Sequence, residues 1–226
     1  MPIGRSLSWT TPAVVPVPVL VLLAALLPVG RQPLAQCPAD TIVICDVTTT
    51  SSAPSYSVSG CAFNNAAADY DLVTGQVSAG VSVAASYVAV TTNDIYTITG
   101  PIGPVAFSAQ LDARAGTEFY GVGTAGIRSD NESREVAFGP CVCFGTGYTQ
   151  TLSLPLTHAV GEPFRLSLIL SGLIPSSNRV RSKAVVTGNL GFTLPPGYIV
   201  TSCQGYSSAP TALRPTTWGQ LKLTYR

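Results

Sequence analysis

The sequence predicts an all-β fold, a two-layer and mostly antiparallel β-sandwich of jelly-roll-like or immunoglobulin-like type. Three observations support this prediction. Apolar and polar residues alternate over residues 151–172, short β-branched runs recur between turn residues, and no long segment after the N-terminus has helical period. A sheet with one apolar face must bury it, so we expect a second sheet packed against the first.

The stretch Thr151–Gly172 shows this alternation most clearly. Its first half alternates leucines with hydroxyl side chains, and in its second half Leu166 and Leu168 alternate with Arg165 and Ser167. A link containing glycine and proline separates the halves, so we expect two half-buried strands with the leucines in the core. Further predicted strands are Thr41–Val47, Val81–Val90, Ile95–Thr99, Val105–Ala113, Phe119–Gly123, Arg134–Phe138, Val180–Thr187 and Tyr198–Cys203.

The N-terminal segment Met1–Ala35 has the pattern of a signal peptide. A basic residue, Arg5, precedes the apolar run Ala13–Leu27, which contains prolines and is shorter than the roughly 20 residues that a membrane-spanning helix needs. We therefore expect export with cleavage near residue 35 and no transmembrane anchor in the mature chain. Lipidation at Cys37 is the alternative, but Gln36 stands where that motif requires a small residue.

The chain after the signal peptide is long enough for one all-β domain with a sizeable core. We expect this β-sandwich domain over residues 36–206, followed by a linker and a short C-terminal tail over 207–226. In the tail Trp218, Leu221 and Tyr225 have helical spacing, whereas Leu221, Leu223 and Tyr225 alternate. A short helix and an edge strand both fit this pattern.

Six cysteines remain after the predicted cleavage, an even number in an oxidising compartment, so we expect three disulfides. A metal site is disfavoured because the closest pair has C-x-C spacing and no histidine nearby. The sequence leaves the pairing open. The candidates are Cys37, Cys45, Cys61, Cys141, Cys143 and Cys203.

The charge is divided unevenly along the chain. Residues 36–162 contain 11 acidic and three basic residues, a net charge of −8, whereas residues 163–226 contain no acidic and seven basic residues, a net charge of +7. Pairing of acidic strands with basic strands is the interpretation that we favour. The alternative is a polyanion site for an acidic surface polysaccharide at Arg179, Arg181 and Lys183, which alternate and would share one strand face. No nucleic-acid partner is expected.

Asp130, Asn131 and Glu132 form a candidate calcium loop, because calcium prefers several oxygen ligands from one loop. A solvated turn is the favoured interpretation, and no other cofactor is expected. Catalytic groups are few: His158 is the single histidine, and no G-x-S-x-G motif accompanies it. We therefore expect no enzyme activity, with a secreted hydrolase as a distant alternative.

Four segments, SYVAVTTNDIYTITG, GPVAFSAQLDARAGTE, SLPLTHAVGEPFRLSLILSG and GNLGFTLPPGYIVTSCQGY, follow one another over about residues 86–206. Together they resemble the exported β-rich proteins of bacteria that often carry a PEP-CTERM sorting tail, although that tail does not follow Tyr206 here. The resemblance implies a location at the cell surface or in the extracellular matrix and no catalytic residues. We expect a secreted or cell-surface location, with the periplasm as the alternative, and surface polysaccharide or other matrix proteins as partners. We expect a non-enzymatic surface or extracellular-matrix protein, with a carbohydrate-binding or polyanion-binding module as the alternative.

Overall fold

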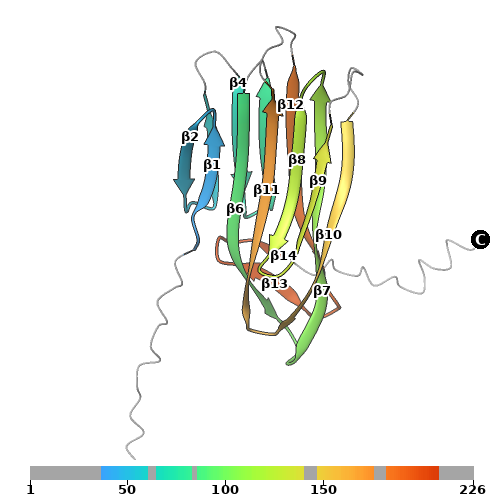
Figure 1. Ribbon diagram of the computed structural model, residues 1–226. Helices are drawn as coiled ribbons and strands as arrows, with labels where there is room; N and C mark the ends of the chain where they lie inside the picture. Colours follow the sequence, from blue (N-terminus) through green and yellow to red (C-terminus); the bar gives the residue numbers. More distant parts are fainter. Residues whose placement is uncertain (1–36, 61–64, 83–85, 140–146, 176–181, 209–226) are drawn as a thin grey trace, which may run out of the picture. The chain divides into compact units, whose positions relative to one another are not determined.

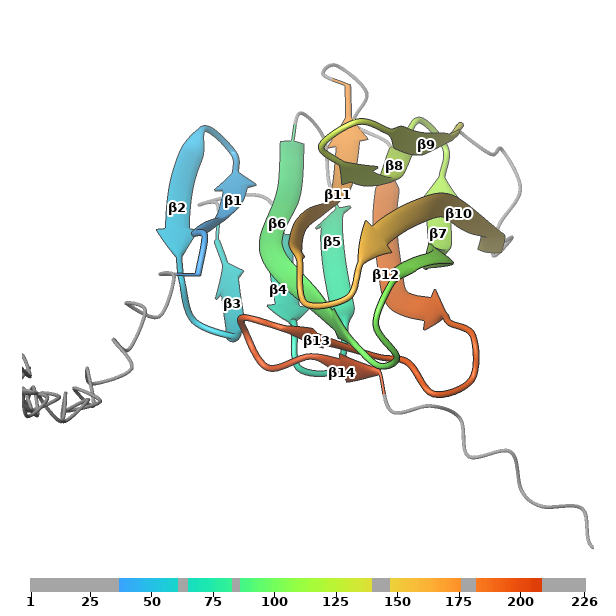
Figure 2. The same cartoon turned by 90° about the horizontal axis from the view of Figure 1, so that it is seen from below.

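The computed structural model describes residues 37–60, 65–82, 86–139, 147–175 and 182–208, and within these ranges the chain forms strands and no helix. The described part therefore has no helix that could span a membrane. Its strands form two antiparallel sheets that pack face to face (Figure 2). The predicted β-sandwich is confirmed.

The first sheet has the order β14-β13-β6-β11-β8-β9, and a hairpin of β1 and β2 also pairs with β6 (Figure 1). β1 pairs with the first part of β6 and β13 with its last part, so two short hairpins follow one another along the same edge of this strand. The strands are β1 (Asp40–Ile44), β2 (Val47–Ser51), β6 (Ser86–Thr99), β8 (Val122–Ser129), β9 (Ser133–Phe138), β11 (Pro163–Ile174), β13 (Ile199–Ser202) and β14 (Ser207–Ser208).

The second sheet has the order β10-β7-β12-β5-β4-β3. Its longest pairing joins β10 to β7 over residues 147–159 and 104–116. The strands are β3 (Ser55–Ser59), β4 (Asn65–Asp71), β5 (Gln76–Ser82), β7 (Pro104–Glu118), β10 (Gly147–Ala159) and β12 (Lys183–Thr193).

The core lies between the two sheets and is built from the alternating apolar residues. Leu166 and Leu168 are buried, at 2% and 1% exposure, whereas Arg165 is exposed and Ser167 is half-buried, as the alternation predicts. An aromatic cluster closes one end of the core around Tyr96, whose ring lies 5.4–6.1 Å from three other rings. These rings belong to Phe164, Phe192 and Tyr206.

The strands on either side of Gly161 lie in different sheets. β10 pairs with β7 in the second sheet, and β11 pairs with β6 and β8 in the first, so their connection crosses from one layer to the other. The predicted strand Val81–Val90 was wrong because this segment also crosses from one sheet to the other. Val81 lies in β5 of the second sheet and Val88 in β6 of the first, and the chain changes layers between them.

The predicted break between Val90 and Ile95 was also wrong. Asn93 and Asp94 read as a turn in the sequence, but both lie inside the continuous strand β6, paired to β11. The predicted strand Phe119–Gly123 was misplaced, because β7 ends at Glu118 and Phe119 adopts a positive φ of 53° in the turn before β8. At Asn93 and Asp94, pairing with β11 outweighed the local signal of the sequence.

A disulfide joins Cys37, just before β1, to Cys203, just after β13, with a Cα–Cα distance of 5.7 Å. This bond occupies the Cys37 sulfur that lipidation would require. Cys45 is also disulfide-bonded. Cys61, Cys141 and Cys143 lie outside the described residues, as does the tail 209–226 with its predicted helix or edge strand.

Candidate functional site

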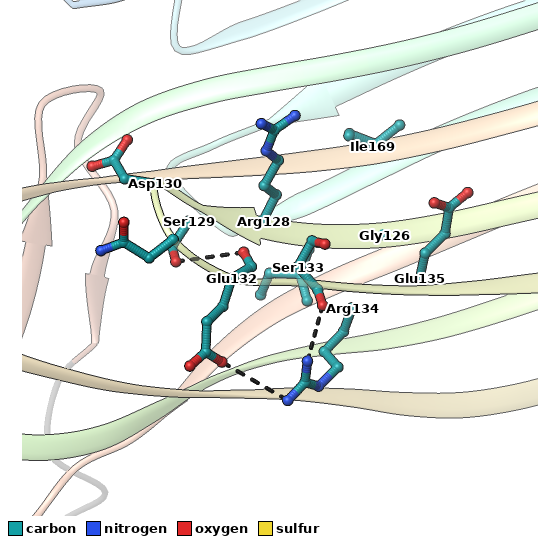
Figure 3. Close-up of a pocket in the computed structure, with 11 residues that line it drawn as sticks. Gly126, Arg128, Ser129, Asp130, Glu132, Ser133, Arg134, Glu135 and Ile169 are labelled. Atoms are coloured by element: carbon teal, nitrogen blue, oxygen red, sulfur yellow. Dashed lines mark hydrogen bonds and ion pairs between the residues drawn. The ribbon is translucent and has the colours of Figure 1, made fainter.

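The turn between β8 and β9 holds the residues that the sequence proposed for calcium. Glu132 forms an ion pair with Arg134 at 3.8 Å, and its main-chain oxygen accepts a hydrogen bond from the backbone amide of Ser129 at 2.8 Å. Figure 3 shows Asp130 extending to one side of the hairpin and Glu132 to the other. Among the described residues no three or more His, Cys, Asp or Glu side chains gather as a metal site. Calcium at Asp130, Asn131 and Glu132 stays a prediction.

A groove with a volume of about 250 Å³ lies over this hairpin, lined by residues 126–135 and Ile169 (Figure 3). We call it the β8–β9 groove. Ile169, Gly126 and Glu135 are direct neighbours across β11, β8 and β9, on the outer face of the first sheet. Gly126 has no side chain, so a gap separates Ile169 from Glu135, and a Cβ added there would lie 3.6 Å from the Glu135 side chain. The groove floor is therefore the space left by this glycine.

Arg128 and Glu135 extend to the same side of the hairpin (Figure 3). Both side chains are exposed, and neither forms a hydrogen bond or an ion pair with another described residue. An arginine offers five N–H donors and an ionised glutamate offers only acceptors. The groove therefore presents donors, acceptors and the aliphatic side chain of Ile169 to solvent within one small volume.

The outer face next to the groove is rich in hydroxyl groups that bind one another across strands. The Ser167 hydroxyl donates to Asn93 Oδ1 at 2.7 Å, and the hydroxyls of Thr124 and Ser171 lie 2.7 Å apart. These pairs satisfy part of the hydrogen-bonding capacity of the face. Unlike these hydroxyls, the side chains of Arg128 and Glu135 have no protein partner among the described residues, and the same holds for Asp130 and Asn131 in the turn.

Of the residues proposed for a polyanion, Lys183 alone lies in the described part of the chain, and Arg179 and Arg181 lie outside it. Lys183 is exposed at the start of β12, directly opposite Glu118 of β7. At this position a basic residue of the late chain therefore faces an acidic residue of the early chain, as cross-strand complementarity predicts. The polyanion site stays a prediction.

His158 lies at the end of β10 rather than in a turn, and its ring stacks on Phe164 with centroids 4.6 Å apart. The ring of Phe107 lies 6.2 Å away. No described hydroxyl, thiol or carboxylate forms a hydrogen bond with His158, so within that part of the chain the histidine acts as a half-buried packing residue.

A second group of polar residues lies inside the sandwich. Asp40, Asp94 and Gln204 are 0%, 2% and 6% exposed. Burial raises the pKa of both carboxyl groups, and hydrogen bonds partly offset that rise. Burial, together with the charge of Asp40, also raises the pKa of Tyr70 to about 12. This cluster was not predicted from the sequence. The sequence feature that could have indicated it is the polar Asn93-Asp94 pair within an otherwise β-branched run.

No family model matches the chain, and no curated protein matches it. Several solved structures are weakly similar, including the following three. The enzymatically active domain of bacteriophage CBA120 tailspike protein 4 is 15% identical with a TM-score of 0.30, covering 72% of this chain and 20% of that one. TmCBM61 in complex with β-1,4-galactotriose is 8% identical with a TM-score of 0.27, covering 63% and 89% of the two chains. The infectious bursal disease virus Gx strain structure is 12% identical with a TM-score of 0.27, covering 69% and 41%. This chain thus spans about a fifth of the tailspike domain's length, and similarities this low leave the function to be argued from its own residues.

Proposed function

We propose that the protein is an exported, non-enzymatic surface or matrix protein that binds neutral saccharide chains in the β8–β9 groove. One observation carries the proposal: Arg128 and Glu135 have no protein partners among the described residues, and they extend to the same side of the hairpin, next to the gap left by Gly126. A ligand that both donates and accepts hydrogen bonds fits this pair. Sugar hydroxyls do both.

The size and charge of the groove narrow the ligand class. Its volume of about 250 Å³ lies below the range of about 300–1,000 Å³ for pockets that enclose a drug-sized ligand. One unit of a longer chain therefore fits better than a whole enclosed ligand. Arg128 lies beside the acidic residues Asp130 and Glu135, and this mixed charge favours a neutral chain over a polyanion.

The surroundings of His158 support a non-enzymatic role. A hydrolase that used this histidine as a base would need a nucleophile within hydrogen-bonding distance. The ring instead stacks on Phe164, and no described nucleophile reaches it. The disulfide between Cys37 and Cys203 supports export, because such bonds persist in oxidising compartments.

A glycan array followed by calorimetry on the best glycan tests the proposal. Hydrogen bonds to charged groups contribute about 1.5–3 kcal/mol, so Arg128→Ala should weaken binding by about 10- to 100-fold. Gly126→Val should weaken it as well, because the added side chain fills the gap while its Cβ contacts stay at 3.4 Å or longer. Both variants should keep the melting temperature of the wild type within a few degrees.

Arg114→Ala is the matched control, because Arg114 is an exposed arginine on β7 of the second sheet and does not line the β8–β9 groove. Its affinity should equal that of the wild type. Failure of every glycan to bind would leave a purely structural surface role. An equal loss in Arg128→Ala and Arg114→Ala would show that binding does not depend on the β8–β9 groove. Turnover in a glycosidase or esterase panel would contradict the non-enzymatic role.

A further inference from the structure

The Asp40–Asp94–Gln204 cluster occupies a gap along one edge of β6. β1 pairs with Val88–Thr91 and β13 pairs with Tyr96–Thr99, so Thr92–Ile95 lies between the ends of the two hairpins. Asp40 begins β1, Asp94 lies in the gap, and Gln204 lies in the turn after β13. Three distant parts of the chain therefore bring polar side chains to one buried place.

Oxygen atoms surround the Gln204 side-chain amide. Its Nε2 lies 3.1 Å from Asp40 Oδ2, 3.3 Å from the Pro38 carbonyl oxygen and 3.5 Å from the Asn93 carbonyl oxygen. An amide NH₂ group has two hydrogens, so three oxygens compete for two donors. Asp40 Oδ1 accepts the backbone amide of Asn93 at 2.7 Å, and Asp94 Oδ1 accepts that of Ile95 at 2.7 Å.

Three buried oxygens of this region have no partner in hydrogen-bonding geometry: Asp94 Oδ2, Gln204 Oε1 and the Tyr70 hydroxyl. Tyr70 nevertheless lies close enough to Asp40, and the Ser202 hydroxyl close enough to Asp94, to offset part of the rise in pKa that burial gives each carboxyl group. No Lys, Arg or His among the described residues forms an ion pair with Asp40 or Asp94. Two buried carboxylates without a cation are costly, since removing each charge from water costs several kcal/mol. The cluster thus combines negative charge, unpartnered oxygens and no balancing positive charge.

We propose that the Asp40–Asp94–Gln204 cluster is a structural calcium site. Its available ligand atoms are all oxygens, from two carboxylates, the Gln204 amide and the carbonyls of Pro38 and Asn93. Calcium takes 6–8 such ligands in a flexible geometry, whereas zinc prefers nitrogen and sulfur, and magnesium usually keeps several waters that a buried site leaves little room for. The two carboxylates balance the charge of one divalent cation.

The Gln204 side-chain amide can direct either its NH₂ group or its oxygen toward the calcium position. In the structure its Nε2 faces the three oxygens and its Oε1 is unpartnered. A half-turn of the amide would direct Oε1 toward the same place, where it is a ligand for calcium rather than a hydrogen-bond donor. Calcium would then connect the residues before β1, the middle of β6 and the turn after β13, next to the Cys37–Cys203 bond.

Terbium luminescence on the wild-type full chain is the first test, since terbium substitutes for calcium and is sensitised by nearby tyrosines. Tyr70 and Tyr96 lie close enough to the two carboxylates to interact with them electrostatically. We expect luminescence that added calcium abolishes. Extracellular calcium sites typically bind with dissociation constants of about 10⁻⁴–10⁻³ M, so about 10 mM calcium should raise the melting temperature by about 3–10 °C relative to EDTA.

Asp94→Asn should remove both the luminescence and the calcium-dependent shift, and Asp130→Asn, in the exposed β8–β9 turn, is the matched control that should change neither. If Asp94→Asn fails to fold, Gln204→Met takes its place, because it removes the amide ligand and keeps a similar side-chain length. Absence of both signals in the wild type would overturn the proposal. Loss of the signals in Asp130→Asn alone would overturn it in favour of the β8–β9 turn.

Discussion

Removing the Cys37–Cys203 disulfide should cost the protein a large share of its stability. The two cysteines are 166 positions apart in sequence, and the chain-entropy relation gives about 4.7 kcal/mol for a 100-residue loop and about 5 kcal/mol for a loop of this length. The disulfide at Cys45 already restrains the unfolded chain. We therefore take about 5 kcal/mol as the upper bound and expect a loss of about 3–5 kcal/mol for Cys37→Ala with Cys203→Ala.

Urea unfolding measures this loss directly. With a slope of about 2 kcal/mol per molar urea, the midpoint should fall by about 1.5–2.5 M, and the slope itself should rise, because the unfolded chain without the crosslink exposes more surface. Cys203 is exposed and Cys37 is half-buried, so little buried contact is lost with the two sulfur atoms. The change therefore reports the crosslink itself.

The single variant Cys203→Ala is the control, and it should lose about as much stability as the double variant, because either change removes the same bond. A loss below about 1 kcal/mol in the double variant would refute the reasoning, since restriction of the unfolded chain predicts several kcal/mol. A full loss with an unchanged slope would assign the effect to native contacts near the bond instead.

Two further predictions concern the core and the buried carboxylates. Leu168→Ala should lower the free energy of unfolding by about 2–5 kcal/mol, because Leu168 is 1% exposed. Ser167→Ala should lower it by about 0.5–1.5 kcal/mol, because it removes only the hydrogen bond to Asn93. Equal losses of the two variants in chemical denaturation would contradict the assigned faces. Because burial raises the pKa of Asp40 and Asp94 in the folded state, protonation favours folding, so the calcium-free protein should gain stability as the pH falls from 7 to about 5. Asp94→Asn should gain less over this range in urea unfolding with EDTA, and a gain equal to that of the wild type would assign the effect to other groups.

The sequence by itself determined the fold class and the buried faces of the most regular strands. Alternation over residues 151–172 indicated β10 and β11, and the buried leucines are those that the period of two selected. This prediction succeeds because neighbouring side chains of a strand point to opposite faces whatever the strand pairs with. The even number of cysteines likewise predicted disulfides, and among the described residues Cys37, Cys45 and Cys203 are bonded.

The tertiary structure alone decided how the strands are distributed between the sheets and which residues meet. Gly126, Ile169 and Glu135 form one groove because the register of three strands places them in one row. Gln204 contacts Asp40 although the two residues are 164 positions apart in sequence. Asn93 and Asp94 lie within strand β6 because every residue of β11 pairs with this strand. A local pattern specifies the period of a strand but not its partners, since register and sheet choice depend on contacts between distant segments. Both candidate sites arise from such contacts. The sequence therefore proposed Asp130, Asn131 and Glu132, which line the β8–β9 groove, but did not indicate Arg128 and Glu135 or the cluster of Asp40, Asp94 and Gln204.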